Sequence, residues 1–268
     1  LSAAVAELHD YDWLNQHLLP NEKVSIRNIS NDYGVLVLSG PRSRDVLAKL
    51  TDSDLSNEAF RWMRAKTIKV SGIPVRALRV SYVGELGWEL HHPIEKMEAL
   101  YDSLMEAGVE YGIANFGTYA MNSLRMEKAY KGWGSELTTE ITPIEAGLER
   151  FVDFSKSFLG REAALSRKLL GVNTKLVYVS VKTSDSDCLG NEPVLGPEST
   201  VSGGNIIGVT TGGAYGHTVG QSLAFAYVQP QYTEPGTKFD IRILGKNCPA
   251  TVLKDAVYDP DNLRLRDL

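Results

Sequence analysis

A chain of 268 residues, of which 43% are hydrophobic, is long enough to bury one large core or two ordinary ones. Charged residues make up 23% of it and the net charge is −5, so the chain lacks the basic field that holds a nucleic-acid backbone, and we expect no nucleic-acid partner. No apolar run approaches the roughly 20 residues that cross a bilayer, so we expect no membrane partner either.

The first twenty residues, LSAAVAELHDYDWLNQHLLP, have the pattern of an amphipathic helix. Its apolar side chains, among them Val5, Leu8 and Leu19, are out of step with any core of their own. Because the first residue is Leu1 rather than methionine, we expect this helix to belong to a longer chain.

The next elements alternate between strand and helix. Residues 34–39 predict a short strand, and residues 41–50 a helix that buries Val46, Leu47 and Leu50. Strands at 67–70 and 75–90 and a helix at 93–108, which ends at Gly108, complete the series. The order predicts a split α+β sandwich of the ferredoxin-like type.

The stretch SYVGELGWEL at 81–90 joins two strand-like runs through a turn bracketed by two glycines. Alternation along the strands predicts that Leu78, Val80 and Tyr82 share a buried row. By the same rule, Glu89 points to the face opposite Trp88. The turn therefore presents a carboxylate and an aromatic ring beside one corner.

Two interpretations of Glu89 are open. It is either an ordinary solvent-side residue of a strand, as most strand glutamates are, or a ligand-binding carboxylate. In the second case it accepts two hydrogen bonds from a planar heterocycle that carries an amino group beside a ring N–H, because a carboxylate is the only side chain that accepts both. Tyr82 would then offer its ring face or its phenol to the same heterocycle.

Residues 115–118, Asn-Phe-Gly-Thr, predict the N-cap region of a helix over about 119–130. Arg125 on this helix either pairs with Glu127 or another neighbouring acid, or lines a ligand pocket. The loop that follows, KGWGSELTTEITPIEAG, carries Glu136, Glu140 and Glu145, which we expect to be solvated.

Beyond a short polar linker at 169–174, every signal is a short strand. The strands at 175–181, 206–210, 223–228, 238–244 and 250–253 are separated by turn residues and predict a small antiparallel barrel. Cys188 and Cys248 lie far apart in polar surroundings and fit a reducing compartment. Of the five histidines, only His91 and His92 are close in sequence, and adjacent residues of a strand point to opposite faces. We therefore expect no metal site.

Four stretches together resemble one family: SGPRSRDVL (39–47), YVGELGWEL (82–90), NFGTYAMNSLRMEKAYKGWG (115–134) and TPIEAGLERFV (142–152). They resemble the folate-binding aminomethyltransferases of the glycine cleavage system, and within that family the C-terminal half of dimethylglycine and sarcosine dehydrogenases. The resemblance implies an aminomethyltransferase folate-binding domain at 1–170, with its N-terminal part missing, and a C-terminal β-barrel domain at 171–268.

The resemblance also implies a tetrahydrofolate site. Glu89 would anchor the pterin, Tyr82 would pack beside it, and Arg125 would line the pocket. The run at 208–215 resembles the family's glycine-rich T-S-G loop, which makes Tyr215 a further candidate, although a half-buried tyrosine of a barrel loop is the alternative. No catalytic residue is expected in the chain, since the family's catalytic aspartate would lie upstream of Leu1.

In the dehydrogenases, a flavin domain oxidises an N-methyl group of dimethylglycine or sarcosine, and tetrahydrofolate captures the one-carbon unit as 5,10-methylene-tetrahydrofolate. The chain has no glycine-rich dinucleotide fingerprint, so FAD is expected on a domain outside it, and the chain alone is not expected to act as an oxidoreductase. The expected compartment is the cytoplasm, or the mitochondrial matrix in a eukaryote.

Two other functions stay open at this point. A relative of the sulfoniopropionate demethylase type would move a methyl group from sulfur to tetrahydrofolate without a flavin domain. A regulatory protein would keep the fold without turnover, although the presence of both Tyr82 and Glu89 speaks against it. The transfer-RNA-modification branch is disfavoured, because its K-G-C-Y-x-G-Q-E loop has no counterpart in KGWGSELTTE.

Overall fold

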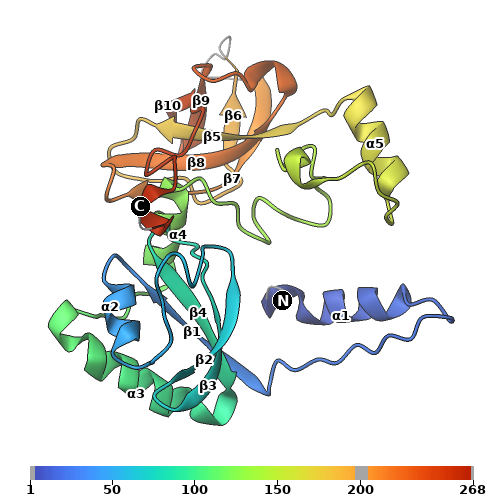
Figure 1. Cartoon of the computed structure of the whole chain (residues 1–268). Coiled ribbons are helices and arrows are strands. Elements are labelled where there is room, and N and C mark those ends of the chain that lie inside the picture. Colours follow the sequence, from blue (N-terminus) through green and yellow to red (C-terminus); the bar gives the residue numbers. More distant parts are fainter. Residues whose placement is uncertain (1–3, 197–204, 267–268) are drawn as a thin grey trace. The chain divides into compact units, whose positions relative to one another are not determined.

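The computed structural model describes residues 4–196 and 205–266, which fold into two compact units (Figure 1). Unit 1 contains the residues up to Phe116 together with the segment from Asn262, and unit 2 contains Gly117 to Asp261. The sequence-based boundary between residues 170 and 171 concerns the family's domains rather than compactness, and it stays a prediction.

Unit 1 is built on a four-stranded antiparallel sheet in the order β1-β4-β3-β2. Its strands are β1 (Tyr33–Ser39), β2 (Ala65–Val70), β3 (Ile73–Leu78) and β4 (Gly87–Pro93). The helices α2 (Ser43–Ala48) and α3 (Met97–Gly108) cover one face of this sheet, as Figure 1 shows. This arrangement confirms the predicted α+β class.

The helix-covered face of the sheet holds the core of unit 1. Val75 of β3 and Trp88 and Leu90 of β4 are fully buried there, packed in one cluster with Leu47 of α2 and Leu100 of α3. Because side chains alternate along a strand, the residues between them point to the other face. We call that other side the open face; its members include Val35, Val37, Arg76, Leu78, Glu89 and His91.

The strand predicted through residue 83 ends earlier than expected. β3 stops at Leu78, and residues 79–86 form a loop before β4. The predicted buried row of Leu78, Val80 and Tyr82 is wrong, because the opposite parity faces the helices: Val75 is fully buried, whereas Tyr82 is 37% exposed.

α3 ends at Gly108 as predicted, but its start and its capping differ from the prediction. Gly108 keeps a helical φ of −88°, and the left-handed turn comes at Gly112, with φ of 72°, after a 3₁₀ turn at Val109–Tyr111. A second 3₁₀ turn, Ile94–Lys96, precedes α3. On α3 the buried side is Leu100, Leu104 and Ala107, while Tyr101 and the preceding Ile94 are exposed.

Two terminal helices complete unit 1. α1 (Glu7–Gln16), after a 3₁₀ turn at Ala4–Ala6, buries no residue, in agreement with its apolar side chains being out of step with a core. α6 (Leu263–Arg266) is held by Arg79, whose buried guanidinium donates from Nη1 to the Phe60 carbonyl at 2.6 Å and from Nη2 to the Arg266 carbonyl at 2.8 Å.

Unit 2 contains a closed antiparallel barrel in the order β10-β5-β8-β7-β6-β9, which confirms the predicted barrel. Its strands are β5 (Lys175–Val181), β6 (Pro193–Leu195), β7 (Ile206–Gly216), β8 (Gln221–Val228), β9 (Lys238–Ile243) and β10 (Lys246–Val252). The unit also holds α4 (Thr118–Glu127), α5 (Arg161–Leu170) and 3₁₀ turns at Glu149–Phe151 and Pro230–Tyr232.

Two expectations about the barrel are corrected by the structure. The glycine-rich run at 208–215 is part of strand β7 rather than a loop. Cys188 and Cys248 are free and buried in the same hydrophobic core instead of lying in polar surroundings. Burial raises the pKa of the Cys188 thiol to about 12, so this thiol is protonated and inert at neutral pH.

No helix within residues 4–196 and 205–266 is both long enough and apolar enough to cross a bilayer.

Trp88 and Glu89 are neighbours on β4 whose side chains lie on opposite faces of the sheet, so substitutions at the two positions should differ in their effect on stability. Trp88→Ala should lower the free energy of unfolding by about 3 to 5 kcal/mol, because it empties a fully enclosed site. Glu89→Ala should change it by less than about 0.5 kcal/mol, since this side chain is 34% exposed. Urea denaturation of both variants measures the difference, and similar losses would contradict the assigned faces.

Candidate functional site

The loop between β3 and β4 fixes where Glu89 emerges. Leu78 and Glu89 are direct partners in the antiparallel ladder, so the hairpin places Glu89 at the loop end of the open face. At the entry to β4, the Leu86 carbonyl accepts hydrogen bonds from Gly40 N at 2.8 Å and from the buried Ser43 Oγ at 3.0 Å. The SGPRSRDVL motif therefore anchors the strand that carries Glu89.

The two glycines of this hairpin act for different reasons. Gly84 has a φ of +80°, which residues with a side chain rarely adopt. Gly87 lies too close to β1 for any side chain, since a Cβ there would be 2.8 Å from the Leu38 carbonyl oxygen and 2.7 Å from Ser39 Oγ. The first glycine shapes the loop and the second lets β1 and β4 approach.

Glu89 stands beside His91 on the open face. His91 Nε2 lies 3.2 Å from Glu89 Oε2, and the His91 side chain is only 12% exposed. The cross-strand neighbours of Glu89 are apolar, Val37 on β1 and Leu78 on β3, whereas His91 has Val35 and Arg76 as neighbours. Within the residues that the structure describes, no group donates a hydrogen bond to Glu89 Oε1, so this carboxylate keeps acceptor capacity for a ligand.

Tyr82 lies in the 79–86 loop of the same unit, and its ring is partly exposed. Tyr82 and Glu89 therefore occur on one hairpin, the first in its loop and the second on its outgoing strand. Their roles as ligand contacts stay predictions.

Arg125 and Tyr215 both belong to unit 2, where α4 packs on β7. Asn122 Nδ2 donates to the Gly213 carbonyl at 3.2 Å, and Ser123 Oγ donates to the Tyr215 carbonyl at 2.6 Å. Tyr215 is 41% exposed, and its ring centroid lies 5.1 Å from that of His217. Because its backbone is held in the strand, only its side chain is available to a ligand.

Arg125 is almost completely buried and is paired with an acid. Its Nη1 donates to Glu136 Oε2 and to the Tyr130 carbonyl, both at 2.8 Å, and its Nε donates to Asn122 Oδ1 at 2.9 Å. The ion pair that one interpretation predicted is thus present, with Glu136 rather than Glu127 as the acid. The expectation that Glu136 is solvated is wrong, since its side chain is 0% exposed.

The loop after α4 supplies the other partners of Glu136. Oε2 also accepts from Gly132 N at 2.7 Å and Ser135 Oγ at 3.0 Å, and Oε1 accepts from Thr211 Oγ1 at 2.7 Å. A buried carboxylate with four such donors is well compensated for the loss of water. Of the other two glutamates in this loop, Glu145 is also buried, contrary to expectation, whereas Glu140 is exposed as predicted.

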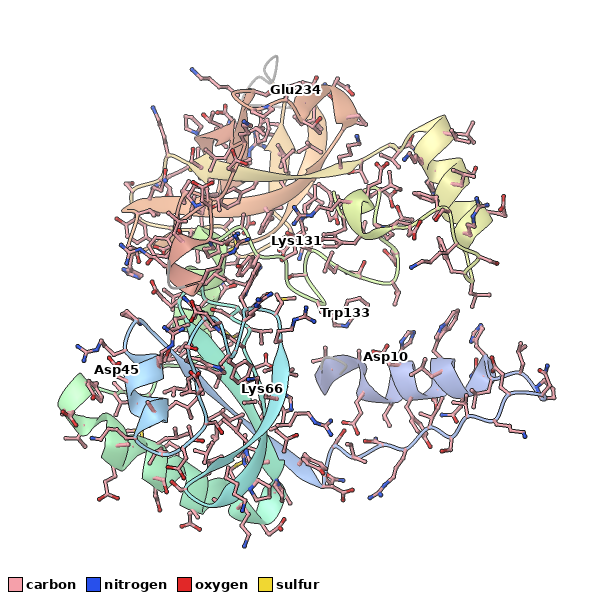
Figure 2. All side chains as sticks on the ribbon, viewed as in Figure 1. Asp10, Asp45, Lys66, Lys131, Trp133 and Glu234 are labelled. Atoms are coloured by element: carbon pink, nitrogen blue, oxygen red, sulfur yellow. The ribbon has the colours of Figure 1, made fainter. Side chains whose placement is uncertain are left out.

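Further charges surround this pair. Burial lowers the pKa of Lys131, the positive charge of Arg150 lowers it further, and the Glu136 carboxylate opposes both. Figure 2 labels Lys131 and Trp133, which lie on the loop that carries Glu136. No group of three or more metal-binding side chains occurs among the described residues.

Sequence reasoning missed His91 and Glu136. The period of two that separated Glu89 from Trp88 also puts His91 on the face of Glu89, so the signal for His91 was present and was weighed only for metal binding. The pairing of Glu136 with Arg125 crosses a loop, and no sequence periodicity predicts such a contact.

Comparison with known families accounts for both units. The GCVT N-terminal domain matches residues 1–156, and the glycine cleavage T-protein C-terminal barrel domain matches residues 175–259. The chain belongs to the glycine cleavage T-protein family. The resemblance carried by the four sequence stretches is thereby confirmed.

Relatives of this T-protein family chain include two dehydrogenases. Dimethylglycine dehydrogenase of Homo sapiens mitochondria is 43% identical over 271 residues, which cover 99% of this chain and 31% of the relative. Sarcosine dehydrogenase of Mus musculus mitochondria is 32% identical over 278 residues, covering 100% of this chain and 29% of the relative. The chain therefore spans less than a third of the length of these relatives.

The fold also matches that of a T-protein whose structure is solved. The crystal structure of the glycine cleavage system aminomethyltransferase T from Bartonella henselae superposes with a TM-score of 0.81 at 25% identity, covering 96% of this chain and 67% of that one. The α+β unit and the barrel are thus the architecture of an aminomethyltransferase.

The Arg125–Glu136 pair is open to a direct stability test. Arg125→Ala should lower the free energy of unfolding by about 3 kcal/mol or more, because it leaves the Glu136 carboxylate buried without its counter-charge. The exposed Arg64→Ala is the matched control and should cost less than about 0.5 kcal/mol. Equal, small effects in thermal or urea unfolding would contradict the burial of the pair.

Proposed function

We propose that this chain is the tetrahydrofolate-binding part of a dimethylglycine or sarcosine dehydrogenase-like enzyme. The one observation that carries the proposal is the Glu89 carboxylate, which stands on the open face between the apolar cross-strand neighbours Val37 and Leu78, with an oxygen that no described residue occupies. The pterin of folate presents an amino group beside a ring N–H, and a single carboxylate accepts both hydrogen bonds.

The other candidate residues would complete the folate site. Tyr82 packs on or beside the pterin, which suits a partly exposed ring in the adjoining loop. Arg125 and Tyr215 are further candidate contacts to folate, as the resemblance to the family implies. His91 contacts the Glu89 side chain from its own strand, and Val37 offers an apolar surface beside it for the flat face of the pterin.

The chemical contribution of these residues is proximity. Tetrahydrofolate is nucleophilic at N5 and N10 without activation, so it needs only to be held near the one-carbon unit that oxidative N-demethylation produces. The product is 5,10-methylene-tetrahydrofolate. The proposed substrate is a methylated amine, dimethylglycine or sarcosine, in keeping with the names of the two dehydrogenase relatives.

The oxidation itself requires FAD, which we assign to a domain outside this chain. The dehydrogenase relatives are about three times as long as the matched part, which leaves room for a flavin domain in them. Their mitochondrial location supports the mitochondrial matrix as the compartment in a eukaryote. The match to aminomethyltransferase T supports a second candidate, a folate-dependent aminomethyltransferase or demethylase without a flavin domain.

The 268-residue chain purified as it stands should be colourless and should oxidise neither dimethylglycine nor sarcosine, because its sequence holds no dinucleotide fingerprint. An absorbance spectrum between 350 and 500 nm, roughly the flavin range in which a bound isoalloxazine absorbs, measures this directly. A yellow preparation with stoichiometric flavin would contradict the assignment of FAD to another domain.

Glu89→Gln tests the folate site itself. The amide keeps one acceptor and places an N–H₂ where the pterin also presents a donor, so the loss of a charge-assisted pair should weaken folate binding by about 30- to 150-fold, or about 2 to 3 kcal/mol. The affinity is measured by titrating 5-formyltetrahydrofolate into the protein in a calorimeter.

The matched control for this titration is Glu98→Gln on the exposed side of α3, which makes the same chemical change away from the open face. It should leave the affinity unchanged. Equal affinities of the wild-type and Glu89→Gln proteins would show that the hairpin is purely structural, and the assignment of Tyr82 and Glu89 would then be abandoned.

A further inference from the structure

The guanidinium of Arg125 is fixed on two of its three nitrogens. Nε is bound to Asn122 Oδ1, and Nη1 is bound to both the Tyr130 carbonyl and Glu136 Oε2. Across the described residues, no group accepts a hydrogen bond from Nη2, and the side chain keeps 8% exposure. A planar guanidinium held at two nitrogens has a defined direction at the third.

Glu136 is itself held in place by hydrogen bonds, so it gives Arg125 a partner with a fixed position. Its Oε2 is shared by Arg125, Gly132 and Ser135, which ties it to its own loop. Its Oε1 accepts from Thr211 Oγ1, which ties it to β7. The backbone carbonyl of Glu136 accepts from Tyr227 on β8 at 2.7 Å, so the barrel holds the residue at both its side chain and its main chain.

Gly212 on β7 is the residue beside Nη2. The β7–β8 ladder shifts register between Thr210 and Gly212, and a Cβ built on Gly212 would lie 4.0 Å from Arg125 Nη2 and 3.8 Å from Glu136 Oε1. A larger side chain at Gly212 would therefore extend over the guanidinium. With glycine at this position, no side chain of residue 212 covers Nη2 of Arg125.

Stability alone does not account for a buried pair of this kind. Burying two charges costs several kcal/mol of desolvation per ion, and well-packed apolar residues of similar volume are often at least as stabilising. What an ion pair adds over apolar packing is a fixed orientation of the polar groups. In this network the only guanidinium nitrogen left over is Nη2.

We propose that Glu136 is a positioning residue: it fixes Arg125 so that Nη2 donates a hydrogen bond to an oxygen acceptor of the bound folate. The inference rests on the proposed function, because it takes Arg125 as a folate contact. Glu136 acts through Arg125 and does not touch the ligand. Without the carboxylate, the guanidinium keeps its charge and its hydrogen bonds to Asn122 and Tyr130, but it loses the charged acceptor among the three groups that fix its direction.

A double-mutant cycle on folate affinity tests the inference, with 5-formyltetrahydrofolate titrated into the wild type, Glu136→Gln, Arg125→Ala and the double variant. Glu136→Gln should weaken binding by about tenfold or more, as the loss of an oriented hydrogen bond to a charged group does. In the Arg125→Ala background, the same change should have no further effect on affinity, because the group it positions is gone.

Glu127→Gln is the matched control. Glu127 is also a fully buried glutamate near the end of α4, but its carboxylate accepts from Thr218 N and Val219 N and, within the described residues, from no nitrogen of Arg125. This variant should lose stability while its folate affinity stays within about twofold of the wild type. A stability readout, such as the urea midpoint of each variant, separates misfolding from a change in binding.

A measurement without folate tests the positioning directly in variants whose urea midpoints show that they are folded. In the wild type, restricted rotation should give Arg125 separately resolved Nη–H signals in nitrogen-15 NMR spectra at low temperature, and Glu136→Gln should average them. The inference is overturned if these signals are unchanged, or if Glu136→Gln weakens folate binding equally in both Arg125 backgrounds. It also fails if only Arg125→Ala weakens binding.

The outcomes also separate this inference from the proposed function. If Glu89→Gln weakens folate binding and Glu136→Gln does not, the folate site stands and the positioning role is wrong. If the wild-type protein binds no folate, the proposed function itself fails, whatever the Arg125 signals show.

Discussion

The burial of Trp88 is the constraint on which the rest of the candidate site depends. With Trp88 and Leu90 enclosed by the helix-covered core, β4 has one possible facing, and the strand's period of two then puts Glu89 and His91 together on the open face. A slip of one residue would exchange the two sets and bury a carboxylate. The SGPRSRDVL motif helps to fix the register, because Gly40 N and Ser43 Oγ donate hydrogen bonds to the Leu86 carbonyl just before the strand begins.

Unit 2 is characterised by a buried ion pair, in which both charged groups are compensated by hydrogen bonds. Arg125 and Glu136 are buried as a pair. Both oxygens of the carboxylate accept hydrogen bonds, from donors on α4, the loop after it and β7. The desolvation cost is thereby offset, and the network holds the loop after α4 against the barrel. A structural role and a binding role for Arg125 are compatible, because the ion pair uses Nη1 and leaves Nη2 for a ligand.

Much of this could be predicted from the sequence, because local patterns determine it. The strand at 175–181 was predicted with both ends correct, and the barrel, the α+β class and the family follow from turn spacing and motifs. The face that β3 turns to the core was predicted wrongly, because the apolar residues Leu78 and Val80 suggested that their side of the strand is buried. The partners of Arg125 and the burial of Glu136 depend on contacts across a loop and with the barrel, which no local pattern encodes.

The central claim is that Glu89 on the open face of unit 1 is the anchor for the pterin of folate. A crystal structure of the protein grown with 5-formyltetrahydrofolate tests it most directly. The account predicts the pterin amino group and ring N–H within about 2.6 to 3.2 Å of the two Glu89 carboxylate oxygens, as charge-assisted hydrogen bonds require. Folate bound elsewhere, with the Glu89 carboxylate still paired only with His91, would contradict it.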